Sequence, residues 1–276
     1  MQRYIFYLTT LVLAALLSSC EDVNVGNLFY TNCDIETRFE SSMEENTTHQ
    51  PFSQSVPEEY SFVVCSDLHL NQEENPYILQ FLSPNQHQDA HFIIYNGDIS
   101  QGHEEDAKAA CEMLKTQTKL PYYFSAGNHD LYFGWYIYQR YFGSSTYSIT
   151  IATPSANDLI LVLESASGTL GVKQMDWLKK QLTQERGKYR NCFIVTHTNF
   201  SHLHVANSSF MSDELQVLYR LFADHHVTAV FSGHAHAQHE TTYLGVPYYT
   251  TDALKNGAYG QMTVGKKQCT WEFKQL

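Results

Sequence analysis

The sequence predicts an α/β fold in which buried strands alternate with helices. Short runs rich in β-branched and aromatic residues, such as His91 to Tyr95, recur between amphipathic stretches, such as Glu104 to Lys119. Five of these runs lead into polar residues, as expected where the carboxyl ends of strands bind ligands. The five motifs are Asp67-Leu68-His69, Gly97-Asp98, Gly127-Asn128-His129-Asp130, His197 and Gly233-His234-Ala235-His236.

Length, net charge and cysteine content exclude several classes of protein. A chain of 276 residues with 43% hydrophobic content is large enough for one substantial core or a two-sheet domain. Its formal net charge of −12, without a basic stripe, argues against binding to a nucleic-acid polymer. The cysteines other than Cys20 are odd in number and show no close pairing, so no disulfide framework is predicted.

Residues 1–19 are predicted to be a lipoprotein signal peptide. Arg3 precedes an apolar run from Ile5 to Leu17 that is short for a membrane span. Leu17-Ser18-Ser19-Cys20 resembles a bacterial lipobox, which implies that Cys20 receives lipid and that a membrane anchor holds the protein in the bacterial cell envelope, on the periplasmic side or the cell surface. The alternative is an ordinary cleaved signal with a chance cysteine.

Residues 20–59 are polar and lack sustained periodicity, so we expect a tether, with the folded domain spanning 60–276. Tyr60 to Cys65 is the first predicted strand. Asp67 and His69, two residues apart at its end, can point into the same space. The alternative for this motif alone is a turn-capping Asp67 beside a surface His69.

The next units repeat this arrangement. A short, partly helical stretch is expected over Pro76 to Ser83, and the strand from His91 to Tyr95 ends at Asp98. Asp98 is the candidate metal-bridging carboxylate. The strand from Pro121 to Ser125 then delivers Asn128, a neutral oxygen ligand, and His129, which can supply a proton or a positive charge.

The aromatic stretch from Leu131 to Phe142 is expected to be core, with a pocket lining as the alternative. A hairpin, two helices and two strands follow in the order Thr146 to Leu163, Gln174 to Leu182, Asn191 to Thr196, Asp213 to His225 and Val227 to Phe231. The last strand leads to His234 and His236, which would gain most by sharing metal. The tail from Tyr243 to Phe273 favours a closing antiparallel sheet.

The ordered motifs closely resemble the calcineurin-like metallophosphoesterase superfamily. The resemblance spans Asp67 to His236, and it implies two mixed β-sheets packed face to face with helices on the outside. It also implies a dinuclear-metal-dependent phosphoester hydrolase, acting on a phosphomonoester or small phosphodiester, in which hydroxide held between two cations attacks phosphorus. The ions would be Mn, Fe, Zn or Ni.

The resemblance also implies a role for each residue. The first metal would be held by Asp67, His69, Asp98 and His236, and the second by Asp98, Asn128, His197 and His234. His129 would be the catalytic histidine beside the phosphate, and Asp130 would orient it or its neighbours.

At two points the sequence departs from the patterns of known branches of the superfamily, and this restricts the branch to which it can belong. Ile99-Ser100-Gln101-Gly102 lacks the Asp-Arg pair of protein serine/threonine phosphatases, and Gln101 stands where purple acid phosphatases have a metal-binding tyrosine. The best likeness is to bacterial enzymes that act on cyclic nucleotides and other small phosphodiesters. The competing hypothesis is a catalytically silent, lipid-anchored binding protein that retains the metal site, although His129, which is not a ligand, favours an enzyme.

Overall fold

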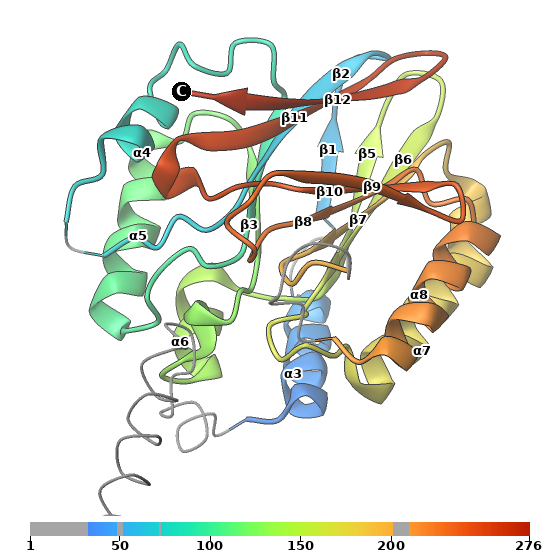
Figure 1. The fold of residues 1–276 in the computed structure, drawn as a ribbon, viewed down its shortest axis with the longest axis horizontal. Helices are drawn as coiled ribbons and strands as arrows, with labels where there is room; N and C mark the ends of the chain where they lie inside the picture. The colour runs from blue at the N-terminus through green and yellow to red at the C-terminus, as the bar shows by residue number, and fades with distance from the viewer. Residues whose placement is uncertain (1–32, 49–51, 72, 201–209) are drawn as a thin grey trace, which may run out of the picture.

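Two mixed β-sheets lie face to face in the middle of the molecule, with helices on their outer sides (Figure 1). The computed structural model describes residues 33–48, 52–71, 73–200 and 210–276. One sheet has seven strands in the order β1-β5-β6-β7-β8-β10-β9, and the other has five in the order β12-β11-β2-β3-β4. The predicted fold class is therefore confirmed.

Each sheet contains a set of neighbouring parallel strands. In the five-stranded sheet, β2, β3 and β4 are parallel, and in the seven-stranded sheet β6, β7 and β8 are parallel. The seven-stranded sheet contains β1 (Phe52–Ser55), β5 (Tyr147–Ala152), β6 (Asn157–Leu163), β7 (Cys192–Thr196), β8 (Ala229–Ser232), β9 (His239–Tyr243) and β10 (Val246–Thr250). The five-stranded sheet contains β2 (Tyr60–Cys65), β3 (Phe92–Asn96), β4 (Tyr122–Ser125), β11 (Ala258–Val264) and β12 (Cys269–Gln275).

Helices cover the outer faces and the edge of this pair of sheets. The five-stranded sheet is covered by α4 (Pro76–Phe81), α5 (Glu104–Gln117) and α6 (Trp135–Phe142). The seven-stranded sheet is covered by α7 (Gly171–Lys180) and α8 (Ser212–Asp224), while α3 (Ile35–Thr48) contacts α7 and β5. Short helical turns are η1 (His129–Leu131), η2 (Gln181–Glu185), η3 (Arg186–Lys188) and η4 (Leu254–Asn256).

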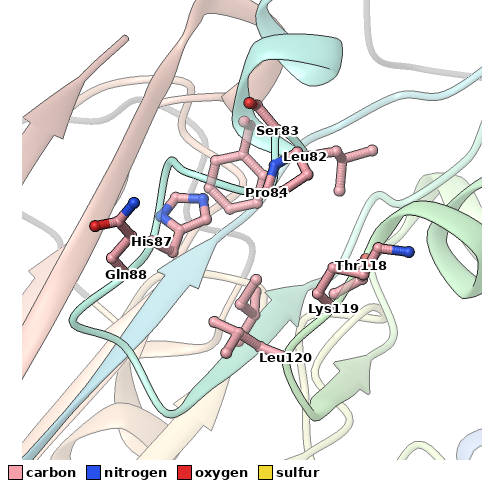
Figure 2. Close-up of a pocket in the computed structure, with 10 residues that line it drawn as sticks. Leu82, Ser83, Pro84, His87, Gln88, Thr118, Lys119 and Leu120 are labelled. Carbon is pink, nitrogen blue, oxygen red and sulfur yellow. The ribbon is translucent and has the colours of Figure 1, made fainter.

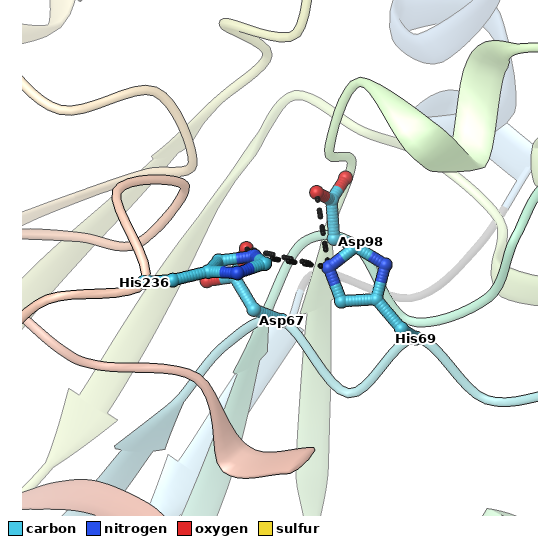
Figure 3. Close-up of side chains that lie close together, drawn as sticks. All are labelled: Asp67, His69, Asp98 and His236. Carbon is cyan, nitrogen blue, oxygen red and sulfur yellow. Dashed lines mark hydrogen bonds and ion pairs between the residues drawn. The ribbon is translucent and has the colours of Figure 1, made fainter. Parts of the chain in front are cut away.

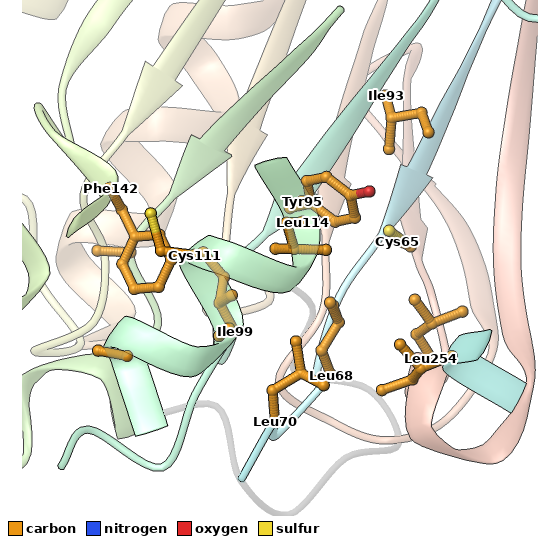
Figure 4. Packing of buried hydrophobic residues seen from close by; sticks show 14 of the residues in the cluster. Cys65, Leu68, Leu70, Ile93, Tyr95, Ile99, Cys111, Leu114, Phe142 and Leu254 are labelled. Carbon is orange, nitrogen blue, oxygen red and sulfur yellow. The ribbon is translucent and has the colours of Figure 1, made fainter. Parts of the chain in front are cut away.

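Alternating side chains of the buried strands fill three hydrophobic layers. In β2, Val63 and Cys65 face α4 and α5, whereas Phe62 and Val64 face the other sheet. Figure 4 shows part of the first layer, in which Cys65 lies among residues from several elements. Strands that are buried on both faces lack polar alternation, which explains their continuous apolar sequence.

Residues 35–48 and 52–55 differ from the predicted tether, because they form α3 and β1 and belong to the fold. The α3 helix buries Arg38 and Ser42, and Arg38 Nε donates to Glu164 Oε2 at 2.9 Å. The β1 strand pairs in parallel with β5. The sequence pattern concealed the helix, because its buried side chains are polar and are satisfied by partners far along the chain.

The tail also differs from the predicted single closing sheet. The β9–β10 hairpin extends the seven-stranded sheet, whereas β11 and β12 extend the five-stranded one. The expectation of an aromatic core is confirmed for Trp135, Tyr138 and Phe142, which are buried.

Two further predictions concern disulfide bonds and the N-terminal signal peptide. Cys33, Cys65, Cys111, Cys192 and Cys269 are free. No helix among the described residues is long and apolar enough to span a membrane. The signal peptide and Cys20 lie outside the described residues.

Candidate metal centre

The five predicted motifs meet at one edge of the molecule, but they come from both sheets. Three follow the parallel strands β2, β3 and β4, and two follow β7 and β8 of the facing sheet. Because the carboxyl ends of both parallel sets lie at the same edge, the first predicted ligand of each motif follows its strand by only one to three residues. The single rim expected from the sequence is therefore shared between two sheets.

Asn96, the last residue of β3, connects the sheets at this edge. Its side-chain Nδ2 donates to the carbonyl of Thr196 at 2.9 Å, and its Oδ1 accepts from Ser125 Oγ. Its own carbonyl lies 2.9 Å from His197 Nδ1, so it accepts the Nδ1 proton of that ring. When the ring is neutral, as it is when it binds a cation, this bond leaves the lone pair of His197 on Nε2, which faces the cluster.

Glycines permit the loops to approach this closely. A Cβ on Gly97 would lie 2.4 Å from His197 Nδ1, and one on Gly127 would lie 2.2 Å from the backbone nitrogen of Asp98. A Cβ on Gly233 would lie 2.2 Å from Ser66 Oγ. In the three motifs that contain a glycine, the close contact between loops therefore leaves no room for a side chain at that position.

The first candidate ligand group consists of Asp67, His69, Asp98 and His236, shown in Figure 3, whose ligand atoms all lie within 4.8 Å of one another. His236 Nε2 is 3.1 Å from both Asp67 Oδ1 and His69 Nε2. His69 Nε2 is also 3.8 Å from Asp98 Oδ2. Figure 3 shows these side chains converging from different parts of the chain, with Asp67 and His69 on the same loop.

The second group shares Asp98 with the first and adds His197 and His234. His197 Nε2 lies 3.3 Å from Asp98 Oδ2. Asn128 belongs with this group, because its Oδ1 is 2.9 Å from His234 Nδ1. All seven residues predicted as ligands therefore lie in two adjoining groups that share one carboxylate.

Several of these residues adopt a strained backbone conformation. Asp67, His69, Asp98, His234 and His236 all have φ between 46° and 68°, in the left-handed region that non-glycine residues rarely occupy. Such conformations cost of the order of 1 kcal/mol each and persist where the surroundings enforce them, most often at functional sites. Among the described residues, only His226 and Leu244 are further non-glycine examples.

Charges in the cluster favour a bound cation. Burial opposes ionisation of Asp98, but the charge of the nearby His197 outweighs it and holds the pKa of this carboxyl well below its usual range. Burial likewise opposes the charge on His197, yet Asp98 raises the pKa of that imidazole to about 10. Burial lowers the pKa of His69 to about 4. Ionised carboxylates in this buried setting require positive charge nearby.

The donor set fits divalent metal ions. Asp67 Oδ1 and His197 Nε2 are buried without a hydrogen-bond partner among the described residues, and their nearest polar neighbours are other atoms of the two groups. Carboxylate, amide and imidazole donors together suit Zn, Mn, Fe or Ni. A cation in each group would satisfy these buried atoms.

His129 lies beside the cluster but belongs to neither group. Its ring Nε2 is 4.0 Å from Asp98 Oδ2, and its backbone N–H donates to Asp98 Oδ1 at 2.8 Å. Its Nδ1 lies 3.0 Å from Oε1 of Gln101. Because an amide oxygen only accepts, Nδ1 carries the proton in this pair, and Nε2 is the atom that can exchange one at the site.

Sequence reasoning missed three residues that hold these side chains in place. Gln101 was noted only as a departure from a family pattern. Tyr132 Oη accepts from Asn128 Nδ2 at 3.1 Å, which turns Oδ1 toward His234. Ser66 Oγ donates to Asp67 Oδ2 at 2.5 Å, leaving Oδ1 for the cluster. All three lie close to a motif in the sequence and can form hydrogen bonds, which is the feature by which the sequence could have identified them.

Asp130 lies behind the loops, buried away from the cluster. Its Oδ1 accepts from the backbone N–H of Ser100, and its Oδ2 accepts from that of Gly127. Burial, with a contribution from Asp98, raises the pKa of Asp130 to about 7. These bonds tie the loops after β3 and β4 together, so Asp130 positions its neighbours and makes no described contact with the His129 ring.

A separate cavity of about 120 Å³ lies at the other end of the strands (Figure 2). Its lining includes His87, Ile93 near the start of β3, and Leu120 just before β4. The candidate ligands follow the carboxyl ends of the same strands. This cavity is therefore remote from the metal centre and adds nothing to it.

A pair of mixed sheets with candidate metal ligands at their shared edge fits the phosphoesterase class. The chain belongs to the calcineurin-like phosphoesterase family, whose model matches residues 60–238. This family uses divalent metals, and the two groups are its candidate ligands here. No curated protein sequence matches the chain.

Solved structures share the fold at low sequence identity. A dimetal phosphatase from Danio rerio is 13% identical with a TM-score of 0.61, and the match covers 78% of this chain and 96% of that one. GAP50, described as the anchor in the inner membrane complex of Plasmodium, is 13% identical with a TM-score of 0.60, over 79% and 84%. The purple acid phosphatase PPD1 from yellow lupin (Lupinus luteus) seeds is 12% identical with a TM-score of 0.60, over 80% and 52%.

Proposed function

We propose that this protein hydrolyses a small phosphoester with two divalent cations bound at the candidate metal centre. The observation that carries the proposal is the pair of ligand groups sharing Asp98, with His129 next to them and outside both. The first cation would be held by Asp67, His69, Asp98 and His236, and the second by Asp98, Asn128, His197 and His234.

The protein's own groups would supply orientation and proton transfer. When bound, the two cations would neutralise phosphoryl oxygens and activate water. Gln101 holds the His129 ring through Nδ1, so Nε2 is directed to donate a proton to the leaving oxygen or to stabilise charge on the phosphoryl group. Asn96 holds His197 in the same manner through its carbonyl.

The substrate in this proposal is a phosphomonoester or a small phosphodiester. A net charge of −12 disfavours long polyanions, whose binding requires many basic contacts. The fold by itself leaves a binding protein without turnover as the alternative, because GAP50, described as an anchor, has it as well. The position of His129 supports the enzyme, because a purely structural metal site has no need of that side chain.

The test compares three histidine variants on p-nitrophenyl phosphate and bis(p-nitrophenyl) phosphate, with metal content measured on the same samples. His129→Ala should keep its metal and lose turnover by roughly a hundredfold or more. His234→Ala should lose metal and activity together, because a nitrogen ligand is gone. His226→Asn is the matched control, since His226 is exposed in the turn after α8 and asparagine tolerates its positive φ.

Two results would contradict the proposal. Full turnover in His129→Ala would remove that residue from the chemistry. Wild-type protein that contains two ions per chain but hydrolyses neither compound, nor any phosphoester in a wider screen, would favour the binding protein. Fewer than two ions in active protein would refute the dinuclear site alone.

The same proposal places the protein in the bacterial cell envelope through a lipid on Cys20. The support is the resemblance of Leu17 to Cys20 to a lipobox that follows a signal-like apolar run. Cys20→Ser should move the protein from the membrane fraction to the soluble fraction. Unchanged fractionation would refute the anchor.

A further inference from the structure

A polar cavity of about 220 Å³ adjoins the metal centre. It is lined by His69, a candidate ligand, and by Gln101, which holds His129. Lys255 lines the same cavity, together with Glu73 and Glu74. The cavity therefore touches both a ligand and the support of the proposed catalytic histidine, and it has room for a small polar group.

The backbone around Lys255 is fixed on both sides. Its carbonyl accepts from Asn75 Nδ2 at 3.0 Å, and the N–H of the preceding Leu254 donates to the carbonyl of Ser66 at 2.8 Å. Leu254 is fully buried in the core layer drawn in Figure 4. Lys255 thus projects from a turn anchored to the loop that carries Asp67.

Lys255 brings a positive charge to this cavity. Lys173, Lys179, Lys188 and Lys274 form ion pairs with carboxylates, whereas Lys255 forms none with the described residues. A half-buried cation beside the site of an acidic protein is suited to an anionic group of a substrate.

We propose that Lys255 binds a second anionic group of the substrate, so that the preferred substrates are small phosphoesters that also carry a phosphate or a carboxylate. This inference rests on the proposed function. The scissile phosphate would lie among the ligands, and the lining of the cavity does not include Asp98, His197 or His236. Lys255 also lies beyond residue 238, where the family match ends, as expected of a residue that would select the substrate of this particular chain.

Glu73 and Glu74 line the same cavity with the opposite charge. Both are exposed, and water and salt screen exposed charges much more than a half-buried one. The lysine should therefore dominate at short range. Glu73→Gln and Glu74→Gln should each leave the preference for an anionic substrate in place or increase it slightly.

The experiment uses two matched pairs of substrates with the full chain. One pair is p-nitrophenyl phosphate and its ring-carboxylated analogue, and the other is adenosine 5′-monophosphate and adenosine 3′,5′-bisphosphate. The variants are Lys255→Met, Lys255→Arg and the control Lys266→Met, which removes the same charge at the exposed β11–β12 turn. Metal content and kcat/KM are measured on the same samples.

Wild type should prefer the substrate with the additional anion in at least one pair, and the two pairs distinguish carboxylate from phosphate. Lys255→Met should lower kcat/KM for that substrate by about tenfold to a hundredfold, with little change for its partner. Lys255→Arg should retain most of the preference, and Lys266→Met all of it.

Equal losses on both members of each pair would overturn the inference, because Lys255 would then act on the scissile phosphate or on the fold. An unchanged preference in Lys255→Met would overturn it as well. Wild type that is inactive on all four compounds and on other phosphoesters would refute the proposed function, and this inference with it.

Discussion

Replacement of Arg38 tests whether α3 belongs to the folded domain. Arg38 and Glu164 form an ion pair whose side chains are only 3% and 2% exposed. The guanidinium also donates to the carbonyl of Cys33 at 2.7 Å and to Ser167 Oγ at 2.6 Å. Arg38→Ala would leave the Glu164 carboxylate buried with only the N–H of Ala166 as a described donor.

The burial of this ion pair determines how much stability Arg38→Ala should lose. Removing one partner of a buried ion pair costs about 3–5 kcal/mol, because the remaining charge stays desolvated. For a domain of this size, each kcal/mol lowers the melting temperature by about 2–4 °C, so a fall of roughly 6–20 °C is expected. The double variant Arg38→Met with Glu164→Leu should recover most of this loss, since two apolar side chains need no partner.

Urea unfolding measures the loss of unfolding free energy, and thermal melting measures the fall in melting temperature. Lys173→Met is the matched control, because Lys173 of α7 and Glu40 of α3 also join α3 to the rest of the domain, but through an exposed ion pair. This variant should leave the unfolding midpoint nearly unchanged. If Arg38→Ala unfolds at the same urea concentration as Lys173→Met, α3 does not contribute to the stability of the domain and the reasoning is wrong.

Two further predictions concern the metal centre. Gln101→Ala should retain metal but lower kcat about tenfold, because His129 loses the acceptor of its Nδ1 proton, while Gln101→Glu should restore activity; equal activity of both variants, measured on an aryl phosphate, would contradict this role. Gly127→Ala should lose metal and stability, because its Cβ would lie 2.1 Å from Asp98 Oδ1, whereas Gly187→Ala, with nothing within 4 Å of its Cβ, should behave as wild type in metal analysis and unfolding.

The sequence by itself determined the fold class and the residues of the candidate site. Runs such as residues 92–95 are apolar because they are buried on both faces, and this pattern can be recognised without knowing which strands lie beside them. At the ends of three such strands, a glycine is followed by an aspartate, an asparagine or a histidine. These residue types seldom recur together at strand ends unless they form a binding site. Asp67, Asp98 and His234 could therefore be named before any contact was known.

Only the tertiary structure decided which strands share a sheet and which polar residues meet. Arg38 has no partner within its own helix, and its ion pair with Glu164 spans 126 positions of the chain. Gln101 likewise becomes informative only when η1 brings His129 against it. Local periodicity records which face of an element is apolar, whereas long-range hydrogen bonds and charge pairs depend on how the elements pack. The role of α3, the support of His129 and the cavity beside Lys255 therefore came from the folded chain.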